Sequence, residues 1–570
     1  MNEIGWQVWA SRRRVLRYAA VLGASLALAW PAARPGAAAQ GNASAGKPNF
    51  LVIVADDMGF SDAGCYGGDI ATPNLDKLAA GGLRFTQMYS TARCWPSRTC
   101  ILTGYYAQQV RMDPPRGRVP AWTRVLPHYL KPLGYRTYHS GKWHLTGAPK
   151  PVADGGFDHS YCIDDHNRYF APKNARLDDQ PLPPVPDGTN FYLTTAIAGY
   201  SIDFLKEHTQ KHAKEPFLLY LCFTSPHFPL HALQEDIARY KDRYREGWDM
   251  MREQRYQRMR QMGIVDCALS QRDPVTIPNW NLAEEQLRKQ IGPGEAAHAV
   301  AWNDLSPEQK QFQATKMAIH AAMIDRMDRE IGRVLEQVKA MGVFENTVIF
   351  FVSDNGASAE QIIRGDGHDP AAPPGSAKTF LCLGPGWSTS SNTPLRLHKS
   401  WVHEGGIASP LIVYWTAGIS ERGQLRHSPG HFIDLLPTIV ELAGGTTAGD
   451  WHGATPPPLP GRSLVPALAK DIEIPREYLY WHHINNRAIR AGEWKLVSAG
   501  GKQEDGPWEL YNLHTDRCEM KNLAEQQPER VKQLAELWQK CEDQFRQQAG
   551  PPEPGMEKTK KERKQKKRAD

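Results

Sequence analysis

The chain has 570 residues, of which 41% are apolar and 23% are charged. These are the proportions of an ordinary globular protein, so wholesale disorder and collagen-like repeats are excluded. The net charge of +6 comes from the two ends: residues 1–39 hold five basic residues and one acidic residue, and residues 557–570 hold eight basic and three acidic ones. The remainder is mildly acidic, which argues against a nucleic-acid-binding protein.

The N-terminus has the pattern of an export signal. Arg12, Arg13 and Arg14 precede a modest apolar run over residues 18–30, and three alanines at 37–39 suit a cleavage site. The adjacent arginines favour a twin-arginine signal. An uncleaved anchor is the alternative, but the run has roughly 13–16 apolar residues against the ~20 that span a bilayer. We therefore expect removal of residues 1–39, a periplasmic or secreted protein, and no stable membrane insertion after that removal.

The number of cysteines is odd. Because there are nine cysteines, at least one is unpaired or has another fate. None of them forms a CxxC motif, which argues against a structural zinc site. Their disulfide pairing stays open.

Three apolar runs have the length and composition of buried strands: residues 49–55, 217–223 and 347–353. Helical patterns lie between them, and strands that alternate with helices form a mostly parallel sheet covered on both faces. Each run stops at polar residues, which are Asp56 and Asp57, then Ser225-Pro226-His227, then Asp354 and Asn355. Ligands of such sheets sit beyond the carboxyl ends of the strands, so we expect these polar residues to converge.

Two helices are predicted between these strands. The first is short and amphipathic, over residues 73–81. The second begins with Ser306 as N-cap, Pro307 in the first turn and Gln309 as the capping-box residue. One face of it is apolar, with Met317, Ala321, Ile324, Met327, Ile331, Val334 and Val338.

The polar residues at the strand ends form a hard ligand set. Asp56, Asp57, Asp354 and Asn355 offer only oxygen donors, which prefer Ca²⁺ or Mg²⁺ to zinc or copper. Without a cation, three clustered carboxylates would raise the pKa of at least one of them. Any one of these residues taken alone is more simply a turn former.

A longer motif begins at Cys94. Residues 94–104 read Cys-Trp-Pro-Ser-Arg-Thr-Cys-Ile-Leu-Thr-Gly, which resembles the signature of type I sulfatases, where C-x-P-S-R directs oxidation of the cysteine to formylglycine. Other motifs of that family appear in the expected order: Asp56-Asp57, Gly141-Lys142-Trp143-His144, Ser225-Pro226-His227, Ser353-Asp354-Asn355-Gly356, and Lys399 ahead of Glu404-Gly405-Gly406. The resemblance covers residues 47–545. It is closest to bacterial arylsulfatases with a long helical insertion, here residues 237–262, whose apolar stripe predicts packing.

The resemblance implies an alkaline-phosphatase-like fold with a defined set of site residues. The metal, Ca²⁺ or Mg²⁺, would be bound by Asp56, Asp57, Asp354, Asn355 and an oxygen of the modified Cys94. Arg98 would hold the modified residue, Asp354 would accept its proton, and Lys142 and Lys399 would grip the sulfate. His227 or Lys399 would protonate the leaving oxygen, and His144 would assist elimination.

Formylglycine explains why a sulfate ester is the implied substrate. Its hydrate carries two hydroxyls on one carbon: one attacks sulfur, and the other loses its proton so that the aldehyde re-forms and sulfate leaves. Pro96 suits the first turn of a helix that continues to Leu102, which puts residue 94 at a positive helix end. A sulfated small molecule or sulfated carbohydrate is the expected substrate, and a formylglycine-generating enzyme is the expected maturation partner.

Two other functions compete with the sulfatase. One is a phosphate or phosphonate ester hydrolase on the related fold; a two-zinc phosphatase would show further His and Asp ligands, which this sequence lacks. The other is a non-catalytic sulfate-binding protein, which would follow if Cys94 were never oxidised.

We expect four parts along the chain: the signal at 1–39, a catalytic domain at 47–450, a C-terminal α+β subdomain at 451–549 and a basic disordered tail at 550–570. The subdomain is predicted to hold strands at 477–482 and 494–497 and a final helix at 527–548, which fits an antiparallel sheet with one packed helix.

Overall fold

The computed structural model describes residues 46–114, 117–500 and 506–551. The expected signal at 1–39 and the basic run at 557–570 lie outside the described residues. The strands of the large sheet are β1 (Asn49–Asp56), β2 (Leu83–Tyr89), β3 (Arg136–Lys142), β4 (His159–Ile163), β5 (Ala175–Leu177), β6 (Gln180–Pro181), β7 (Phe217–Pro226), β8 (Thr347–Ser353), β9 (Ala408–Tyr414), β10 (Gln424–Arg426) and β11 (Gly430–His431).

These strands form one mixed sheet whose centre is parallel. Their order is β10-β2-β9-β8-β1-β7-β3-β4-β5-β6, with β11 paired to β2. The pairs β8–β1, β1–β7, β7–β3 and β3–β4 are parallel, whereas β9 is antiparallel to both of its neighbours. The three strands predicted from apolar runs are therefore neighbours in the middle of the sheet, so the residues that follow them meet at one edge.

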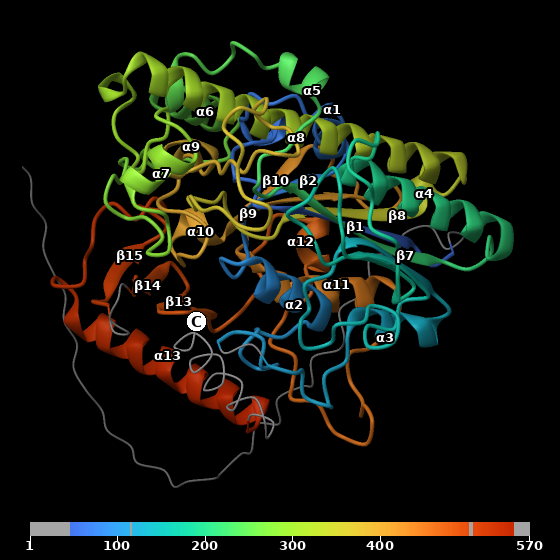
Figure 1. Cartoon of the computed structure of the whole chain (residues 1–570). Helices are drawn as coiled ribbons and strands as arrows, with labels where there is room; N and C mark the ends of the chain where they lie inside the picture. The colour runs from blue at the N-terminus through green and yellow to red at the C-terminus, as the bar shows by residue number, and fades with distance from the viewer. Residues whose placement is uncertain (1–45, 115–116, 501–505, 552–570) are drawn as a thin grey trace, which may run out of the picture. The chain divides into compact units, whose positions relative to one another are not determined.

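Helices cover both faces of this sheet. The helices of the described residues are α1 (Pro73–Gly81), α2 (Cys94–Thr103), α3 (Leu126–Leu130), α4 (Leu193–Lys211), α5 (Gln234–Ala238), α6 (Gly247–Gln261), α7 (Glu284–Gln290), α8 (Pro307–Ala340), α9 (Pro385–Ser391), α10 (Glu404–Ile407), α11 (Leu435–Leu442), α12 (Val465–Ala469) and α13 (Pro528–Ala549). Figure 1 shows α1, α4 and α8 on one face and α2, α3 and α11 on the other.

Alternate residues of the central strands feed two separate cores. On β1, Leu51 and Ile53 pack with α1, α4 and α8, whereas Phe50 and Val52 pack with the helices of the other face. This alternation is the ordinary two-residue period of a strand, with both faces buried. The predicted mostly parallel sheet flanked by helices is confirmed.

The long helix α8 begins as predicted. The Ser306 hydroxyl accepts a hydrogen bond from the Gln309 backbone N at 3.1 Å, and the Gln309 side chain accepts one from the Ser306 backbone N at 3.0 Å. This reciprocal pair is a capping box. All seven residues of the predicted apolar face are buried.

The predicted helical insertion at 237–262 contains the end of α5 and the whole of α6. α5 and α6 are separated by residues 239–246, and α6 starts at Gly247, whose φ is +81°. A Cβ at this position would lie 2.0 Å from the Trp302 ring, so only glycine fits and the continuous helix is broken here. The packing prediction is right for Tyr244, Trp248, Met251 and Met259, which are buried, and wrong for Met262, which is exposed.

A second, smaller sheet lies in the C-terminal part. Its antiparallel strands are β12 (Leu479–His483), β13 (Asn486–Ala491), β14 (Trp494–Ser498) and β15 (Glu509–Asn512), and α13 packs on it (Figure 1). The predicted antiparallel sheet with one helix is confirmed, and β13 and β15 add to the two strands that were predicted. The division of the chain at 450/451 stays a prediction.

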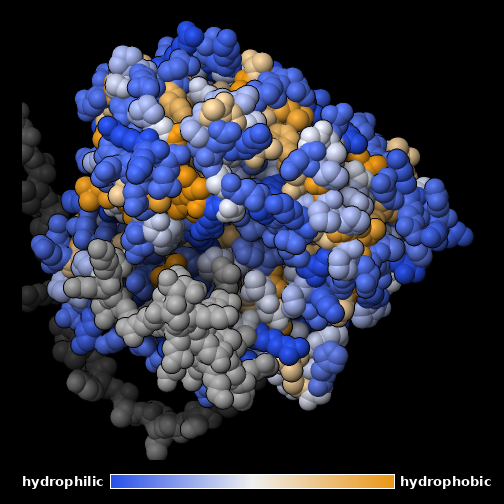
Figure 2. All heavy atoms as spheres, in the orientation of Figure 1, coloured by the Kyte–Doolittle hydropathy of each residue, from blue (hydrophilic) through white to orange (hydrophobic). Residues whose placement is uncertain are grey.

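The described surface is mainly hydrophilic on the face shown in Figure 2, with apolar residues gathered in patches. Among the described residues, none of the helices combines the length and the apolar character that crossing a membrane requires. All nine cysteines are described, buried and free of disulfide bonds, and the Sγ atoms of Cys267 and Cys518 are 3.0 Å apart.

Candidate active site

Asp56 and Asp57 reach the same place because β1 ends in a left-handed turn. Asp56 is the last residue of β1, and consecutive residues of a strand point to opposite faces. Asp57 has a φ of +67°, a conformation that costs a non-glycine residue about 1–3 kcal/mol. The turn brings the carboxylates of Asp56 and Asp57 and the ring of His227 within 4.8 Å of one another.

Cys94 is the first residue of α2, and Arg93 is the N-cap. The Cys94 thiol and the carboxylates of Asp56 and Asp354 lie within 4.8 Å of one another. The unpaired backbone N–H groups of a helix start favour an anion at this point. Burial raises the pKa of the Cys94 thiol, so an unmodified thiol here is the protonated and weakly nucleophilic form.

Arg98 lies on the same helix, one turn further on. Its Nε and Nη2 atoms are 2.9 and 2.8 Å from the Asp354 carboxylate, and Nη1 donates to the Lys142 carbonyl at 2.8 Å. Both Arg98 and Asp354 are completely buried. The guanidinium therefore joins α2 to the ends of β8 and β3.

Two lysines complete the centre of the site. Lys142 ends β3, and its Nζ is 2.5 Å from Asp56 Oδ2. Lys399 comes from the loop before α10, and its Nζ is 2.7 Å from Asp57 Oδ2. Gly141 has a φ of +112°, and a Cβ there would be 1.9 Å from the Cys222 carbonyl, so glycine is required for β3 to approach β7 just before Lys142.

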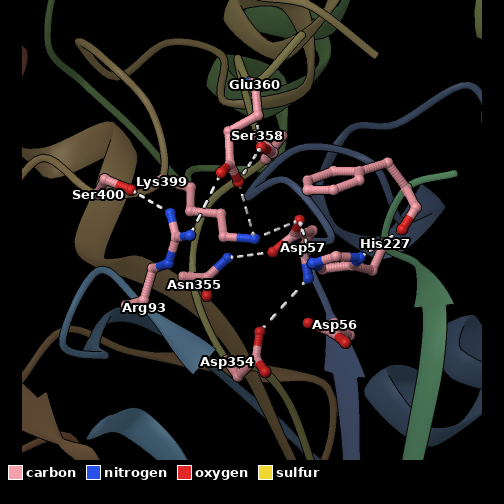
Figure 3. Close-up of polar contacts among 12 residues, drawn as sticks. Asp56, Asp57, Arg93, His227, Asp354, Asn355, Ser358, Glu360, Lys399 and Ser400 are labelled. Atoms are coloured by element: carbon pink, nitrogen blue, oxygen red, sulfur yellow. Dashed lines mark hydrogen bonds and ion pairs between the residues drawn. The ribbon is translucent and has the colours of Figure 1, made fainter. Parts of the chain in front are cut away.

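The side chains of Asn355 and His227 both point toward Asp57 (Figure 3). The Asn355 amide donates to Asp57 Oδ1 at 2.7 Å. His227 Nδ1 donates to the Phe228 carbonyl at 2.6 Å, and its Nε2 faces Asp57 Oδ2 at 3.7 Å. Burial, with Lys399 and Lys142 nearby, holds the pKa of His227 well below its ordinary value.

His144 lies beside this centre, with a φ of +55°. Its ring packs edge-on against Trp95 at 5.9 Å and lies 5.6 Å from the ring of His166, which in turn contacts His227 at 5.1 Å. Burial and the charge of Lys142 lower the pKa of His166 to about 3. His166 was not predicted from the sequence, although it lies three residues after the end of the short strand β4.

Arg93, Glu360 and Trp280 also escaped the sequence analysis. Glu360 is buried and lies 3.2 Å from the Arg93 guanidinium and 3.4 Å from Lys399 Nζ (Figure 3). The Trp280 indole N–H donates to Glu360 at 2.8 Å. Each of these residues is of a type that is common at protein surfaces or in cores, and none belongs to a recognisable motif. No local pattern therefore identifies them.

The aspartates differ in their electrostatic surroundings. Burial raises the pKa of Asp354 to about 7, with the like charge of Asp56 adding to the effect. Burial also raises the pKa of Asp57. For Asp56, burial acts in the same direction, but the charges of Lys142 and Arg98 outweigh it and bring the pKa below its ordinary value. The three clustered, buried carboxylates are thus stabilised by the cationic side chains that contact them.

The donor set fits a hard divalent cation. Asp56 Oδ1 and Asn355 Oδ1 are buried oxygens without a hydrogen-bond partner, and they belong to the four residues whose oxygens the sequence analysis assigned to a metal. An unpartnered buried oxygen costs about 1–3 kcal/mol, which a coordinated cation removes. Carboxylate and amide oxygens are the ligands of Ca²⁺ and Mg²⁺.

Comparison with known proteins gives the family of this chain. The sequence model of the Sulfatase family matches residues 48–445. The chain belongs to the sulfatase family. A second model, of the N-sulphoglucosamine sulphohydrolase C-terminal region, matches residues 396–548 of the sulfatase.

Individual relatives cover most of the sulfatase. An uncharacterized sulfatase of Schizosaccharomyces pombe is 30% identical over 86% of this chain and 93% of its own length. An arylsulfatase of Klebsiella aerogenes is 30% identical over 70% of this chain and 87% of its own length. One solved structure, a protein in complex with its substrate D-glucosamine-2-N,6-O-disulfate, has a TM-score of 0.59 at 20% identity and covers 90% of this chain and 100% of its own.

Membership of the family favours one of the functions considered from the sequence. The sulfatase is an enzyme of sulfate ester hydrolysis, which disfavours the phosphatase and the non-catalytic binding protein. The structure brings Asp56, Asp57, Cys94, Asp354 and Asn355 to one centre, with Arg98, Lys142, His227 and Lys399 around it and His144 at its side.

Proposed function

We propose that this sulfatase cleaves a sulfate monoester to an alcohol and inorganic sulfate, with Cys94 converted to formylglycine and one divalent cation, Ca²⁺ or Mg²⁺, bound beside it. The observation that carries the proposal is the position of residue 94. This residue is the first of α2, lies within 4.8 Å of two carboxylates, and is flanked by two lysine–aspartate pairs. A tetrahedral monoanion placed there meets a helix N-terminus and two ammonium groups.

Formylglycine and the divalent cation would supply the bond-making chemistry. Hydrated formylglycine supplies an oxygen nucleophile and a second hydroxyl whose deprotonation lets sulfate leave. Asp56, Asp57, Asp354, Asn355 and residue 94 would hold the cation, whose positive charge would lower the pKa of the nucleophile and stabilise the sulfate oxygens.

The chain's own residues position and stabilise. Lys142 and Lys399 are buried ammonium groups that bind the sulfate oxygens, and at an effective dielectric of about 20 one such contact near 4 Å is worth roughly 4 kcal/mol before desolvation. Arg98 fixes Asp354, which lies close enough to residue 94 to take its proton.

Lys399 is better placed than His227 to protonate the leaving oxygen. The Nδ1–H of His227 is committed to the Phe228 carbonyl, so the neutral ring faces the site with an acceptor nitrogen. Lys399 has three N–H donors, of which its two carboxylate contacts use at most two. His144, beside Trp95, would assist the release of sulfate.

We propose a sulfated carbohydrate or a small sulfate ester as the natural substrate. A relative of the same fold was solved with a sulfated amino sugar, and another relative is an arylsulfatase, which supports both classes. A formylglycine-generating enzyme is the proposed maturation partner. We further propose export by the twin-arginine signal to the periplasm or the medium, with oxidation of Cys94 before export, because that route carries folded proteins.

Peptide mass spectrometry across residue 94 tests the nucleophile. We expect the mass of an aldehyde or its hydrate in the mature protein. An intact thiol would contradict the formylglycine mechanism.

A matched pair of substrates tests the reaction class. We expect turnover of an aryl sulfate well above that of the aryl phosphate with the same leaving group, and loss of both activities in C94A. A preference for the phosphate would make the enzyme a phosphoryl hydrolase instead.

A further inference from the structure

Glu360 lies at the junction of the catalytic centre and the rim of the site. Its side chain is 1% exposed, and its two oxygens have different partners. Oε1 accepts from Trp280 Nε1 at 2.8 Å and lies 3.2 Å from Arg93 Nη2. Oε2 lies 3.4 Å from Lys399 Nζ and accepts from the Ser358 hydroxyl at 3.2 Å. Figure 3 shows Lys399 between Glu360 and Asp57.

The partners on Oε1 belong to a partly exposed surface next to residue 94. Arg93 directly precedes Cys94, and its guanidinium lies 5.6 Å from the Trp280 ring and 5.5 Å from the Trp95 ring. Trp280 is 37% exposed, which is unusual for a large aromatic side chain. A flat indole backed by a guanidinium is a surface on which an aromatic or sugar ring stacks.

Trp280 is held in this position by more than its indole. The neighbouring Asn281 side chain donates to the Ala359 carbonyl at 3.0 Å and accepts from the Gln361 backbone N at 2.9 Å. The segment that carries Trp280 is therefore bonded to the residues on both sides of Glu360. On the far side of the guanidinium, Arg93 Nη1 donates to the Ser400 hydroxyl at 2.6 Å, one residue after Lys399.

Glu360 and Arg93 add one charge of each sign, so the side chains around residue 94 stay balanced when this pair is included. Arg93, Arg98, Lys142 and Lys399 match Asp56, Asp57, Asp354 and Glu360, so the eight side chains sum to zero. A divalent cation then leaves +2 to receive a substrate monoanion. Without Glu360, Lys399 would keep only Asp57, a residue that the cation also needs.

We propose that Glu360 is a positioning residue that holds Lys399 against the sulfate and, through its other oxygen, holds Arg93 and Trp280 as one wall of the leaving-group site. This inference rests on the proposed function, because it takes Lys399 as a sulfate-binding group. In this arrangement, the Glu360 carboxylate fixes the distance between the sulfate position and the leaving group. The substrate class that fits the wall is a sulfate ester whose alcohol carries a flat or ring-shaped group.

Two variants separate the two sides of Glu360. E360Q removes the negative charge that faces both Lys399 and Arg93, so kcat/KM falls about tenfold or more with every aryl sulfate, the effect of losing one charge-assisted hydrogen bond. Inhibition by inorganic sulfate weakens as well, because Lys399 is no longer held. W280A removes the wall and one hydrogen bond to Oε1, but it leaves the contact of Oε2 with Lys399. KM rises for an ester with a large aromatic leaving group, while inhibition by inorganic sulfate stays unchanged. E360D, which keeps the carboxylate on a shorter stem, recovers part of the loss.

E330Q is the matched control. Glu330 on α8 is also buried, and it pairs with Thr195, Arg326 and Arg333, none of which is a proposed site residue. This variant lowers the melting temperature but changes neither kcat/KM nor sulfate inhibition. If E360Q behaves like E330Q, losing stability but not sulfate inhibition or turnover, the inference is wrong. Absence of turnover in the wild-type protein would contradict the proposed function instead; equal affinity of wild type and E360Q for inorganic sulfate by calorimetry would then overturn the role of Glu360 separately.

Discussion

Paired buried charges are the main feature of this sulfatase at the scale of single residues. Arg98, Lys142 and Lys399 each contact an aspartate in a place that excludes water. A buried charge costs several kcal/mol unless it is paired, so each cation and its aspartate hold one another in place. The proposed sulfate-binding groups are thus positioned before a substrate arrives.

Arg98 shows how much of this depends on geometry rather than on charge alone. We expect R98K to lower kcat on the order of 100-fold, because a lysine cannot span Asp354 and the Lys142 carbonyl together and lets the nucleophile shift. Steady-state kinetics with an aryl sulfate measures this effect.

R255K is the control for that experiment. Arg255 is equally buried and joins Asp62 and Asp69, each at 2.7 Å, with no contact to a proposed site residue. We expect it to lower the melting temperature and leave kcat unchanged. Equal kinetic losses in the two variants would mean that R98K acts through general stability.

Removal of the divalent cation is the second prediction at this scale. A chelator should abolish turnover and lower the melting temperature, because a ligand at about 100 times its Kd stabilises the folded state by about 2.7 kcal/mol. Added Ca²⁺ or Mg²⁺ should restore both, and comparing the two ions identifies the preferred one. A melting temperature that does not respond to either ion would contradict the assignment of Asp56, Asp57, Asp354 and Asn355 as ligands.

At the scale of elements, helix ends carry out two different tasks. The start of α2 is buried at the site and has no side-chain cap, so its positive end is directed at the site. The start of α8 is exposed and closed by the capping box of Ser306 and Gln309. The two helix starts therefore differ: the start of α8 has a side-chain cap and the start of α2 has none.

The cap of α8 can be removed without touching the site. We expect S306A to cost about 1 kcal/mol locally and so to speed amide exchange about fivefold in the first turn of α8, with no change in kcat. Peptide-level hydrogen exchange measures this. T315A, an exposed substitution within the same helix, should leave the first turn unchanged; equal effects of the two variants would contradict a specific role for the cap.

At the scale of the whole molecule, buried ion pairs join the two sheets. Lys495 on β14 lies 2.9 Å from Glu404 in α10 and 2.8 Å from Glu519, and all three side chains are completely buried. The small sheet also reaches the site loop, since the Asn486 side chain donates to the Ser400 carbonyl at 2.9 Å. The C-terminal part therefore supports the loop that carries Lys399.

Breaking this junction should destabilise the protein strongly. We expect K495M to lower the free energy of unfolding by about 3–5 kcal/mol, because it leaves two carboxylates buried beside an apolar chain. Denaturant unfolding measures the loss, and K540M on the exposed side of α13 is the control with little effect. A loss below 1 kcal/mol, the usual size for an exposed pair, would show that these buried ion pairs contribute little to the free energy of unfolding.

Much of the fold and the centre of the site could be read from local patterns. The runs at 49–55, 217–223 and 347–353 are mostly apolar. Asp56 and Asp354 directly follow two of these runs, and His227 directly follows the end of β7. The cap of α8 was equally readable, because a capping box involves four consecutive residues. The helical insertion predicted over 237–262 is helical but interrupted, and its apolar spacing gave no sign of the point where Gly247 turns the chain.

By itself, therefore, the sequence determined which strands are followed by candidate site residues and which residue is the candidate nucleophile, since these follow from spacing along the chain. Only the tertiary structure showed that Glu360 contacts Arg93, 267 positions away, and that His166 lies beside His227. The physical reason is that such side chains have no local signature: glutamate and histidine are common anywhere, and only burial beside particular charges makes these ones part of a site.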